Sequence, residues 1–287
     1  MAKGKAICIG LNHVDPQHYN GWSGELNACE ADAKDMTLLA SSQKFETTTI
    51  LTTEATREVY YSEMGKAADA LQAGDILLVT YSGHGGQVPD QNEDEPDGLD
   101  ETWCLFDGQL IDDENFLLLS KFKEGVRVIF LSDSCHSGSA IKELELRRAL
   151  ALRGYTSHSI GSSIGHSAGM EPVVYRGMPM DVVSSVYLAN KAFYDDLGSK
   201  LPKTKAKVNA SCLLISGCQD SQLSADGAFN GRFTGVLKTV WNGGKFSGTY
   251  KGFHNSIAQR MPLDQTPQLF PLGVDTEKLS LEKPFTI

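Results

Sequence analysis

The chain has 287 residues, of which 41% are hydrophobic and 22% are charged, and its formal net charge is −10. This composition is enough for one sizeable hydrophobic core and excludes a disordered or fibrous protein. The negative charge argues against general binding to nucleic acid or to anionic membranes. The first residues do not resemble a signal peptide, and no apolar run reaches the ~18 residues of a membrane span, so we expect a cytoplasmic protein.

Short apolar segments alternate with helix-like segments along the chain. The expected strands are Lys5–Leu11, Thr47–Leu51, Asp75–Ser82, Val126–Ser132 and Val208–Ser216, and the expected helices are Gly24–Leu39 and Thr56–Gln72. Strands that are apolar on both faces and separated by helices predict an α/β fold with a mostly parallel sheet covered on both sides. Functional sites in such sheets lie at the carboxyl ends of the strands.

This alternation stops between residues 139 and 207, where the sequence predicts no strand. Gly154–Gly169 is rich in glycine and serine, which is typical of a flexible loop. A loop of this length inside a compact domain is usually functional or disordered.

Two segments carry reactive side chains among small residues. Tyr81–Gln87 (YSGHGGQ) follows one expected strand, and Asp133–Ser139 (DSCHSGS) follows another. An imidazole beside a thiol lowers the pKa of the thiol and later protonates the leaving amine. The sequence therefore predicts Cys135 as a nucleophile and His84 as its general base.

The alternatives to this pair are a cysteine without function and a different base. Two reactive residues at matching strand ends favour catalysis over the first alternative. His136 is the rival base, but adjacent residues of an extended segment point in opposite directions, which favours His84. The backbone amides of Cys135 and of Gly85 or its neighbour are the expected oxyanion donors.

The two motifs together resemble the His and Cys motifs of metacaspases and their bacterial relatives, within the caspase-like clan of cysteine peptidases. Further segments resemble that family: Asn27–Met36, Glu93–Glu101, Ser216–Asp226, Gly231–Leu237 and Asp264–Phe270. The resemblance implies a caspase-like three-layer sandwich with a mostly parallel six-stranded sheet and helices on both faces. It implies a cysteine endopeptidase that is monomeric and has no N-terminal prodomain.

The resemblance also implies a single catalytic domain over residues 1–287. Its large-subunit-like portion would extend from 1 to 140, a flexible linker from 141 to 205, and a small-subunit-like portion from 206 to 287. A caspase-like scaffold without catalytic turnover and an Asp-specific peptidase are the alternative functions. A cysteine phosphatase is excluded because the position of its phosphate-binding arginine is Ile141, and no GxSxG serine-hydrolase motif is present.

The resemblance assigns the pocket for the substrate residue before the cleaved bond (P1) to Cys29, Asp32, Ser82 and Asp133. Two carboxylates in a partly desolvated pocket favour a cation, so we expect protein and peptide substrates with Arg or Lys at P1. The alternatives are a solvent-exposed helix carboxylate for Asp32, a carboxylate tied to backbone amides for Asp133, and plain packing for Ser82 and Cys29. Cleavage after Asp would need basic groups, which the pocket-matching segments lack.

The chemistry requires no cofactor, but calcium activation is a further expectation. Asp100, Asp112 and Asp113 are at positions that resemble calcium ligands of metacaspases. Calcium needs six to eight oxygen ligands, and Lys142 stands where the family usually has another Asp, which would weaken such a site. A solvated acidic loop is the alternative interpretation.

Self-processing is the last expectation. An enzyme that cleaves after Arg or Lys would have candidate cleavage sites of its own beside the glycine- and serine-rich loop. The candidate arginines are Arg147, Arg148, Arg153 and Arg176, and the later Lys200, Lys203 and Lys205 are candidates as well. The alternative is that each is only a solvated surface charge.

Overall fold

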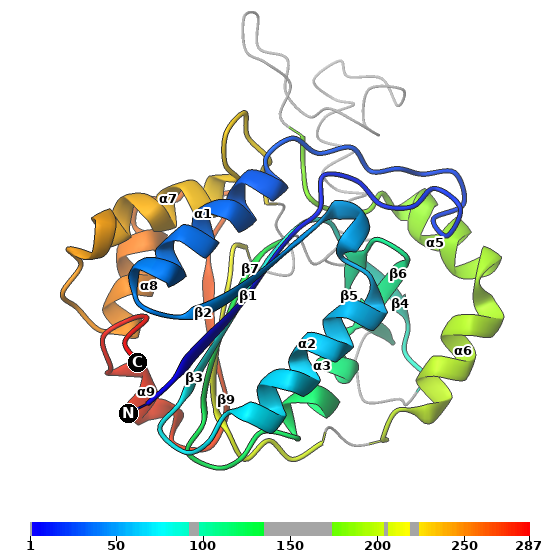
Figure 1. The fold of residues 1–287 in the computed structure, drawn as a ribbon. Helices are drawn as coiled ribbons and strands as arrows, with labels where there is room; N and C mark the ends of the chain where they lie inside the picture. The colour runs from blue at the N-terminus through cyan, green and yellow to red at the C-terminus, as the bar shows by residue number, and fades with distance from the viewer. Residues whose placement is uncertain (1, 92–97, 135–173, 204–205, 219–223) are drawn as a thin grey trace, which may run out of the picture.

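The computed structural model describes residues 2–91, 98–134, 174–203, 206–218 and 224–287. Its centre is a six-stranded sheet (Figure 1). In spatial order the strands are β2 (Glu46–Leu51), β1 (Gly4–Gly10), β3 (Ile76–Ser82), β7 (Arg127–Asp133), β8 (Ser211–Ser216) and β9 (Gln268–Gly273). All neighbouring pairs are parallel except β8 and β9. The predicted mostly parallel six-stranded sheet is confirmed.

The central strands are buried on both faces, which explains their unbroken apolar sequences. Every residue of β3 is buried, and so is every residue of β7 after Arg127. The edge strand β9 is only partly buried, and its sequence QLFPLG lacks the β-branched residues that favour strands. For this reason the five expected strands correspond to observed ones, whereas β9 was not predicted.

Helices cover both faces of the sheet and form the outer layers (Figure 1). One face packs against α1 (Cys29–Ser42), α7 (Arg232–Trp241) and α8 (Tyr250–Ala258). The other face packs against α2 (Arg57–Ala70) and α3 (Asp112–Leu119). The short helix α9 (Thr276–Ser280) and the 3-10 turns Thr52–Glu54 and Asn242–Gly244 complete the layers. The predicted three-layer sandwich is confirmed.

Helix α1 begins five residues later than the sequence predicts. The segment before it is irregular, and the amide of Leu26 donates to the carbonyl of Asn12. Gly24 adopts a positive φ of 56°, which glycine tolerates and a helix does not allow. The Gly24 carbonyl is therefore not part of a helix and is available to another partner.

A second, antiparallel sheet follows the His motif. It consists of β4 (Gly85–Pro89), β5 (Leu99–Leu105) and β6 (Gly108–Ile111), with β5 in the middle. The sequence did not predict it, because β4 is short and contains two glycines and a proline, all of which are depleted in strands. Its first strand holds the backbone of Gly85 in place beside the end of β3.

The end of the predicted flexible linker is helical. Residues 174–203 contain α5 (Met180–Ala189) and α6 (Lys191–Lys200). Val183 and Val186 of α5 are buried in a small cluster with Val14 and Tyr19, which holds α5 against the segment after β1. No helix in the described ranges is long and apolar enough to cross a membrane.

A buried ion pair joins the α2 and α3 side of the fold. Glu114, whose side chain is 0% exposed, accepts hydrogen bonds from Arg57 Nη2 at 2.6 Å, from Arg57 Nη1 at 3.0 Å and from the Ile111 amide at 2.8 Å. The Tyr61 hydroxyl also donates to it. Because every one of these partners is a donor, the site requires a carboxylate.

We therefore expect Glu114→Gln to lower the free energy of unfolding by about 3 kcal/mol, since it leaves the Arg57 charge without its partner. Urea denaturation at pH 7 would measure the change. Glu58→Gln, an exposed substitution on the same helix as Arg57, is the matched control. Equal stabilities of the two variants would contradict a structural role for this ion pair.

Candidate active site

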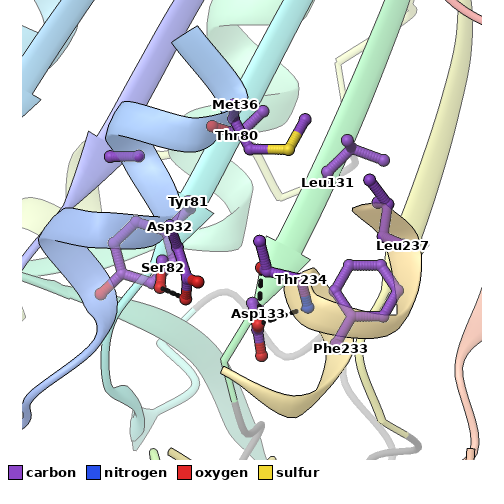
Figure 2. Close-up of a pocket in the computed structure, with 11 residues that line it drawn as sticks. Asp32, Met36, Thr80, Tyr81, Ser82, Leu131, Asp133, Phe233, Thr234 and Leu237 are labelled. Carbon is purple, nitrogen blue, oxygen red and sulfur yellow. Dashed lines mark hydrogen bonds between the residues drawn. The ribbon is translucent and has the colours of Figure 1, made fainter. Parts of the chain in front are cut away.

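The ends of β3 and β7 lie side by side, as the sequence predicts. Ser82 ends β3 and is paired in register with Asp133, the last residue of β7. Asp32, in the first turn of α1, accepts a hydrogen bond from the Ser82 hydroxyl at 2.7 Å. Figure 2 shows Asp32, Ser82 and Asp133 close together beside Phe233 and Thr234 of α7. The structure thus brings three of the four predicted pocket side chains to one place. The fourth, Cys29, is fully buried and lies one helical turn before Asp32.

The guanidinium of Arg176 occupies this place. Its side chain is 0% exposed and lies among the carboxylates of Asp32, Asp133 and Asp226. Its contacts are Nη2 to Asp32 Oδ2 at 2.8 Å, Nη2 to Asp226 Oδ1 at 2.8 Å, Nε to Asp226 Oδ1 at 3.3 Å, Nη1 to Ser82 Oγ at 2.8 Å, and Nη1 to the Asp133 carbonyl at 3.1 Å. All three guanidinium nitrogens therefore donate hydrogen bonds. We call Asp32, Ser82, Asp133 and Asp226 the guanidinium cage.

Other groups hold the cage carboxylates in position. Asp133 accepts from the Ser224 hydroxyl at 2.6 Å and from the amide and hydroxyl of Thr234 at 3.0 and 2.7 Å. Asp32 accepts from the Gly231 amide, and Asp226 from the Asn27 amide at 2.7 Å. The cage is therefore preorganised by neutral donors, which orient its carboxylates without neutralising them.

Gly231 closes one side of the cage with its backbone. A Cβ atom on this residue would lie 2.4 Å from Arg176 Nη1 and 2.5 Å from its Cζ. Real side chains do not approach this closely, so only glycine leaves room for a guanidinium at this position.

Burial and neighbouring charges act in opposite directions on the pKa values of Arg176 and of the groups around it. Burial opposes the charge on Arg176, but Asp133, Cys29, Asp32 and Asp226 outweigh it and raise the pKa of the guanidinium well above its usual value. Burial raises the pKa of Asp32 to about 6, although Arg176 acts to lower it. Burial also raises the pKa of the Cys29 thiol to about 12, so Cys29 stays protonated and is not a nucleophile.

His84 lies directly after β3, 5% exposed and in contact with the Trp22 ring at a centroid distance of 4.7 Å. Its Nε2 lies 3.0 Å from the Gly24 carbonyl, which can only accept, so Nε2 carries the proton. Nδ1 is then the basic nitrogen, and it has no hydrogen-bond partner among the residues described. Burial lowers the pKa of His84 to about 4, which keeps the imidazole neutral at neutral pH.

The main chain of Arg176 is held as firmly as its side chain. Its carbonyl accepts from the Gly85 amide at 3.0 Å, and its amide donates to the Ser224 carbonyl at 2.9 Å. Gly85 is the residue predicted as an oxyanion donor, and its amide here points at a peptide carbonyl.

Several predicted residues lie outside the described part of the chain. Cys135 follows Ser134, the last described residue after β7, and is itself not described. The rival base His136 and the candidate self-processing sites Arg147, Arg148, Arg153 and Lys205 also lie outside it. Of the four candidate arginines, Arg176 alone can be placed, and it is buried in the cage and not on the surface.

The three expected calcium ligands follow or precede the paired residues Thr102 and Ile111, at one end of the β5–β6 pair. Asp100 is in β5, and Asp112 and Asp113 are in the first turn of α3. Across residues 2–91, 98–134 and the other described ranges, no three His, Cys, Asp or Glu side chains form a group able to hold a metal ion. These residues alone do not supply the oxygen ligands that calcium needs, so calcium activation stays a prediction.

The sequence did not predict two parts of the site. Asp226 is a third cage carboxylate, and its place in the family-like segment Ser216–Asp226 was the available signal. Gly24 orients His84 through a backbone carbonyl, for which residue identity gives no signal.

Comparison with known proteins identifies the family. The model of the peptidase C14 family, described as the caspase domain, matches residues 3–275. The chain belongs to the caspase-domain family. Among curated relatives, metacaspase-1A of Aspergillus terreus is 31% identical over 255 residues, and metacaspase-1 of Schizosaccharomyces pombe is 30% identical over 261 residues. These matches cover 82% and 83% of this chain but 60% and 58% of the relatives, so this caspase-domain chain spans less than two thirds of their length.

Two solved structures resemble this caspase-domain protein. A Geobacter sulfurreducens protein is 50% identical, with a TM-score of 0.87 and 99% coverage of both chains. Caspase-1 of Spodoptera frugiperda has a TM-score of 0.50 and 10% identity, and the match covers 95% of this chain and 86% of that one. The second similarity extends to the fold alone.

Proposed function

We propose that this caspase-domain protein is a cysteine endopeptidase that cleaves peptide bonds after Arg or Lys, with Cys135 as nucleophile and His84 as general base. The observation that carries the proposal is the guanidinium cage beside His84. The buried guanidinium of Arg176 is surrounded by Asp32, Ser82, Asp133 and Asp226, and the Gly85 amide donates to the Arg176 carbonyl. A pocket for a cationic side chain and a donor for a peptide carbonyl are what such a peptidase needs.

The proposed reaction has two steps. The neutral Nδ1 of His84 takes the thiol proton, and the Cys135 thiolate attacks the carbonyl carbon of the scissile bond. The Gly85 amide stabilises the oxyanion, the peptide C–N bond breaks with transfer of the proton to the leaving amine, and a thioester forms. Water then attacks the thioester, which releases the new carboxylate and restores the thiol. The Gly24 carbonyl positions His84 in both steps.

The cage favours Arg over Lys. It offers acceptors to all three nitrogens of a planar guanidinium, whereas an ammonium group has one nitrogen and three donors. We therefore expect Lys to be accepted with lower kcat/KM than Arg.

The alternative functions fit these contacts less well. An Asp-specific peptidase needs free cationic donors in the pocket, and each nitrogen of Arg176 already donates to groups of this chain. A scaffold without turnover needs no neutral histidine oriented by a backbone carbonyl.

The edge strand β9 contains Pro271, which lacks the N–H group used in pairing with another sheet, so we also propose that the protein is a monomer.

Hydrolysis of matched peptides ending in Arg, Lys or Asp tests the function. Wild type, Cys135→Ala and Arg176→Ala, which empties the cage, would each be assayed with and without calcium. We expect the order Arg, then Lys, with no cleavage after Asp, and no activity in Cys135→Ala. The calcium arms test whether Asp100, Asp112 and Asp113 serve a metal. Inactivity of both wild type and Arg176→Ala on all three peptides would contradict the proposed function.

A further inference from the structure

The segment between β1 and α1 brings an indole ring against the imidazole of His84. The ring centroids of Trp22 and His84 are 4.7 Å apart, and the ring planes are inclined by 58°. Gly24 is in close contact with both side chains, because a Cβ atom on it would lie 2.7 Å from Cζ2 and Cη2 of Trp22 and 3.0 Å from Cδ2 of His84. The three residues are therefore packed together without room for a further methyl group.

These contacts determine which edge of the imidazole faces Gly24. The Nε2 atom of His84 lies 3.0 Å from the Gly24 carbonyl oxygen, and the neighbouring Cδ2 atom is the one nearest to the Cβ position of Gly24. Nδ1 is on the opposite edge of the five-membered ring and is therefore directed away from Gly24. A flipped ring would place Cε1 at the position of Nε2 and would lose the hydrogen bond to the carbonyl.

The indole is held in place independently of His84. The Trp22 amide donates to the Tyr19 carbonyl at 3.0 Å, and the two rings lie 5.9 Å apart between centroids. The Tyr19 hydroxyl donates to the Leu105 carbonyl at 2.7 Å, which ties the loop to β5. Trp22 also packs against the buried cluster that contains Tyr19 and Val186 of α5. The indole can therefore act as a fixed wall for the imidazole.

The indole also covers the imidazole. Trp22 is partly exposed, whereas His84 is 5% exposed, so the indole lies between part of the imidazole and solvent. Burial is the main cause of the lowered pKa of His84. Among the described residues, the charged groups that act on it are Arg176, which lowers the pKa, and Asp226, which raises it. Loss of the indole would admit water and reduce the cost of charging the imidazole.

We propose that Trp22 is a positioning residue for the general base, and that its ring holds the imidazole of His84 in the orientation in which Nε2 donates to Gly24. This inference rests on the proposed function and deepens it, because it assigns the orientation of the base to a side chain as well as to a carbonyl. The carbonyl selects the tautomer, and the indole restricts rotation of the imidazole about its Cβ–Cγ bond. Without the indole, the imidazole would spend part of its time with Nδ1 misdirected.

Three substitutions separate the effect of the ring from that of general packing. Trp22→Ala removes the ring, and Trp22→Phe keeps an aromatic ring on the same backbone. Val186→Ala is the matched control, because it removes apolar contacts from the same cluster on the side of α5. Thermal denaturation of the full chain would show how much stability each variant loses.

NMR of the same proteins measures the orientation directly. In wild type we expect nuclear Overhauser contacts between the indole protons of Trp22 and the imidazole protons of His84, and nitrogen shifts of the tautomer protonated on Nε2. In Trp22→Ala the pKa of His84 should rise towards its ordinary value of about 6.5, and the two tautomers should mix. Trp22→Phe and Val186→Ala should titrate like wild type.

Kinetics give a second readout that a loss of stability alone would not change. For the Arg peptide, kcat of Trp22→Ala should fall by about 10- to 100-fold with little change in KM, because a misplacement of about 1 Å costs on the order of 100-fold. The acidic limb of its pH profile should move to higher pH together with the pKa of His84. Trp22→Phe should recover most of the lost kcat.

An unchanged pKa and tautomer of His84 in folded Trp22→Ala would overturn the inference, and so would equal losses of kcat in Trp22→Ala and Val186→Ala. Absence of indole–imidazole contacts in the wild-type spectra would also overturn it, and this measurement decides the question even where Trp22→Ala fails to fold. Failure of wild type to hydrolyse any of the Arg, Lys and Asp peptides would instead overturn the proposed function, while the NMR results still decide how His84 is oriented.

Discussion

Replacement of His84 by alanine should lower kcat/KM for an Arg peptide by about 10³-fold, the loss expected when a general base is removed. The structure explains the choice of this histidine through its orientation. The Gly24 carbonyl accepts a hydrogen bond from the protonated Nε2 at 3.0 Å, which leaves Nδ1 as the basic nitrogen. Continuous assay of the purified variants with the Arg peptide would measure the effect.

His136→Ala is the control for this prediction, since His136 is the other histidine next to a reactive motif. We expect it to change kcat/KM by no more than a few-fold. A large loss in His136→Ala with little change in His84→Ala would reverse the assignment of the base.

The low pKa of His84 adds a test of the same assignment. Burial is its main cause, and Arg176 also lowers it, so the imidazole is neutral above about 4 while the cage is filled. Departure of Arg176 removes one of the charges that oppose protonation, so the pKa of His84 should rise when the cage is emptied. The histidine NMR signals of Cys135→Ala, titrated with and without Arg176→Ala, would show this shift.

Replacement of Asp32 by asparagine should lower kcat/KM for the Arg peptide by about 100-fold, because one partner of a buried, hydrogen-bonded charge pair is lost. Most of the loss should be in KM, since Asp32 binds the P1 side chain and does not reach the scissile bond through any described contact. Asp35→Asn is the matched control, because it removes the same charge on the same helix from a carboxylate that contacts Asn230 and Lys238 and not Arg176. Equal losses in the two variants would mean that general charge, and not the cage, attracts the substrate.

The pH dependence follows from the same carboxylate. Burial raises the pKa of Asp32 to about 6 with a guanidinium present, and without that cation it lies higher still. The carboxyl is ionised above its pKa, and only the ionised form pairs with Arg. KM for the Arg peptide should therefore rise as the pH falls through this range, and the rise should be absent in Asp32→Asn. A pH-independent KM in wild type would contradict the role of Asp32.

The sequence predicted the parts of the fold that depend on continuous apolar segments. Buried strands such as β3 and helices with regular apolar spacing such as α2 carry that signal, and Tyr60, Met64, Ala67 and Leu71 are all buried as their spacing indicates. Strand β4 and helices α5 and α6 lack it, because their burial depends on tertiary neighbours: Val14 and Tyr19 for α5, and Ile111 for β4 and α6.

The site shows the same division. Asp32, Ser82 and Asp133 could be named in advance because residue type, strand ends and family resemblance all pointed to them. Arg176 could be named as a basic residue, but its burial could not be foreseen, since it depends on a pairing with Ser224 and Ala225 far along the chain. Gly24 contributes a carbonyl, which every residue has, so sequence alone cannot single it out.

The pairing of β7 with β8 has a consequence for what a cut molecule would look like. These strands lie on opposite sides of the four candidate self-processing arginines, yet they are joined in register from Arg127 with Ser211 to Ser132 with Ser216. Helix α7, from the second piece, packs on the same sheet face as α1 from the first. A nicked protein should therefore keep the hydrodynamic size of the intact one, and its two polypeptides should separate only under denaturing conditions.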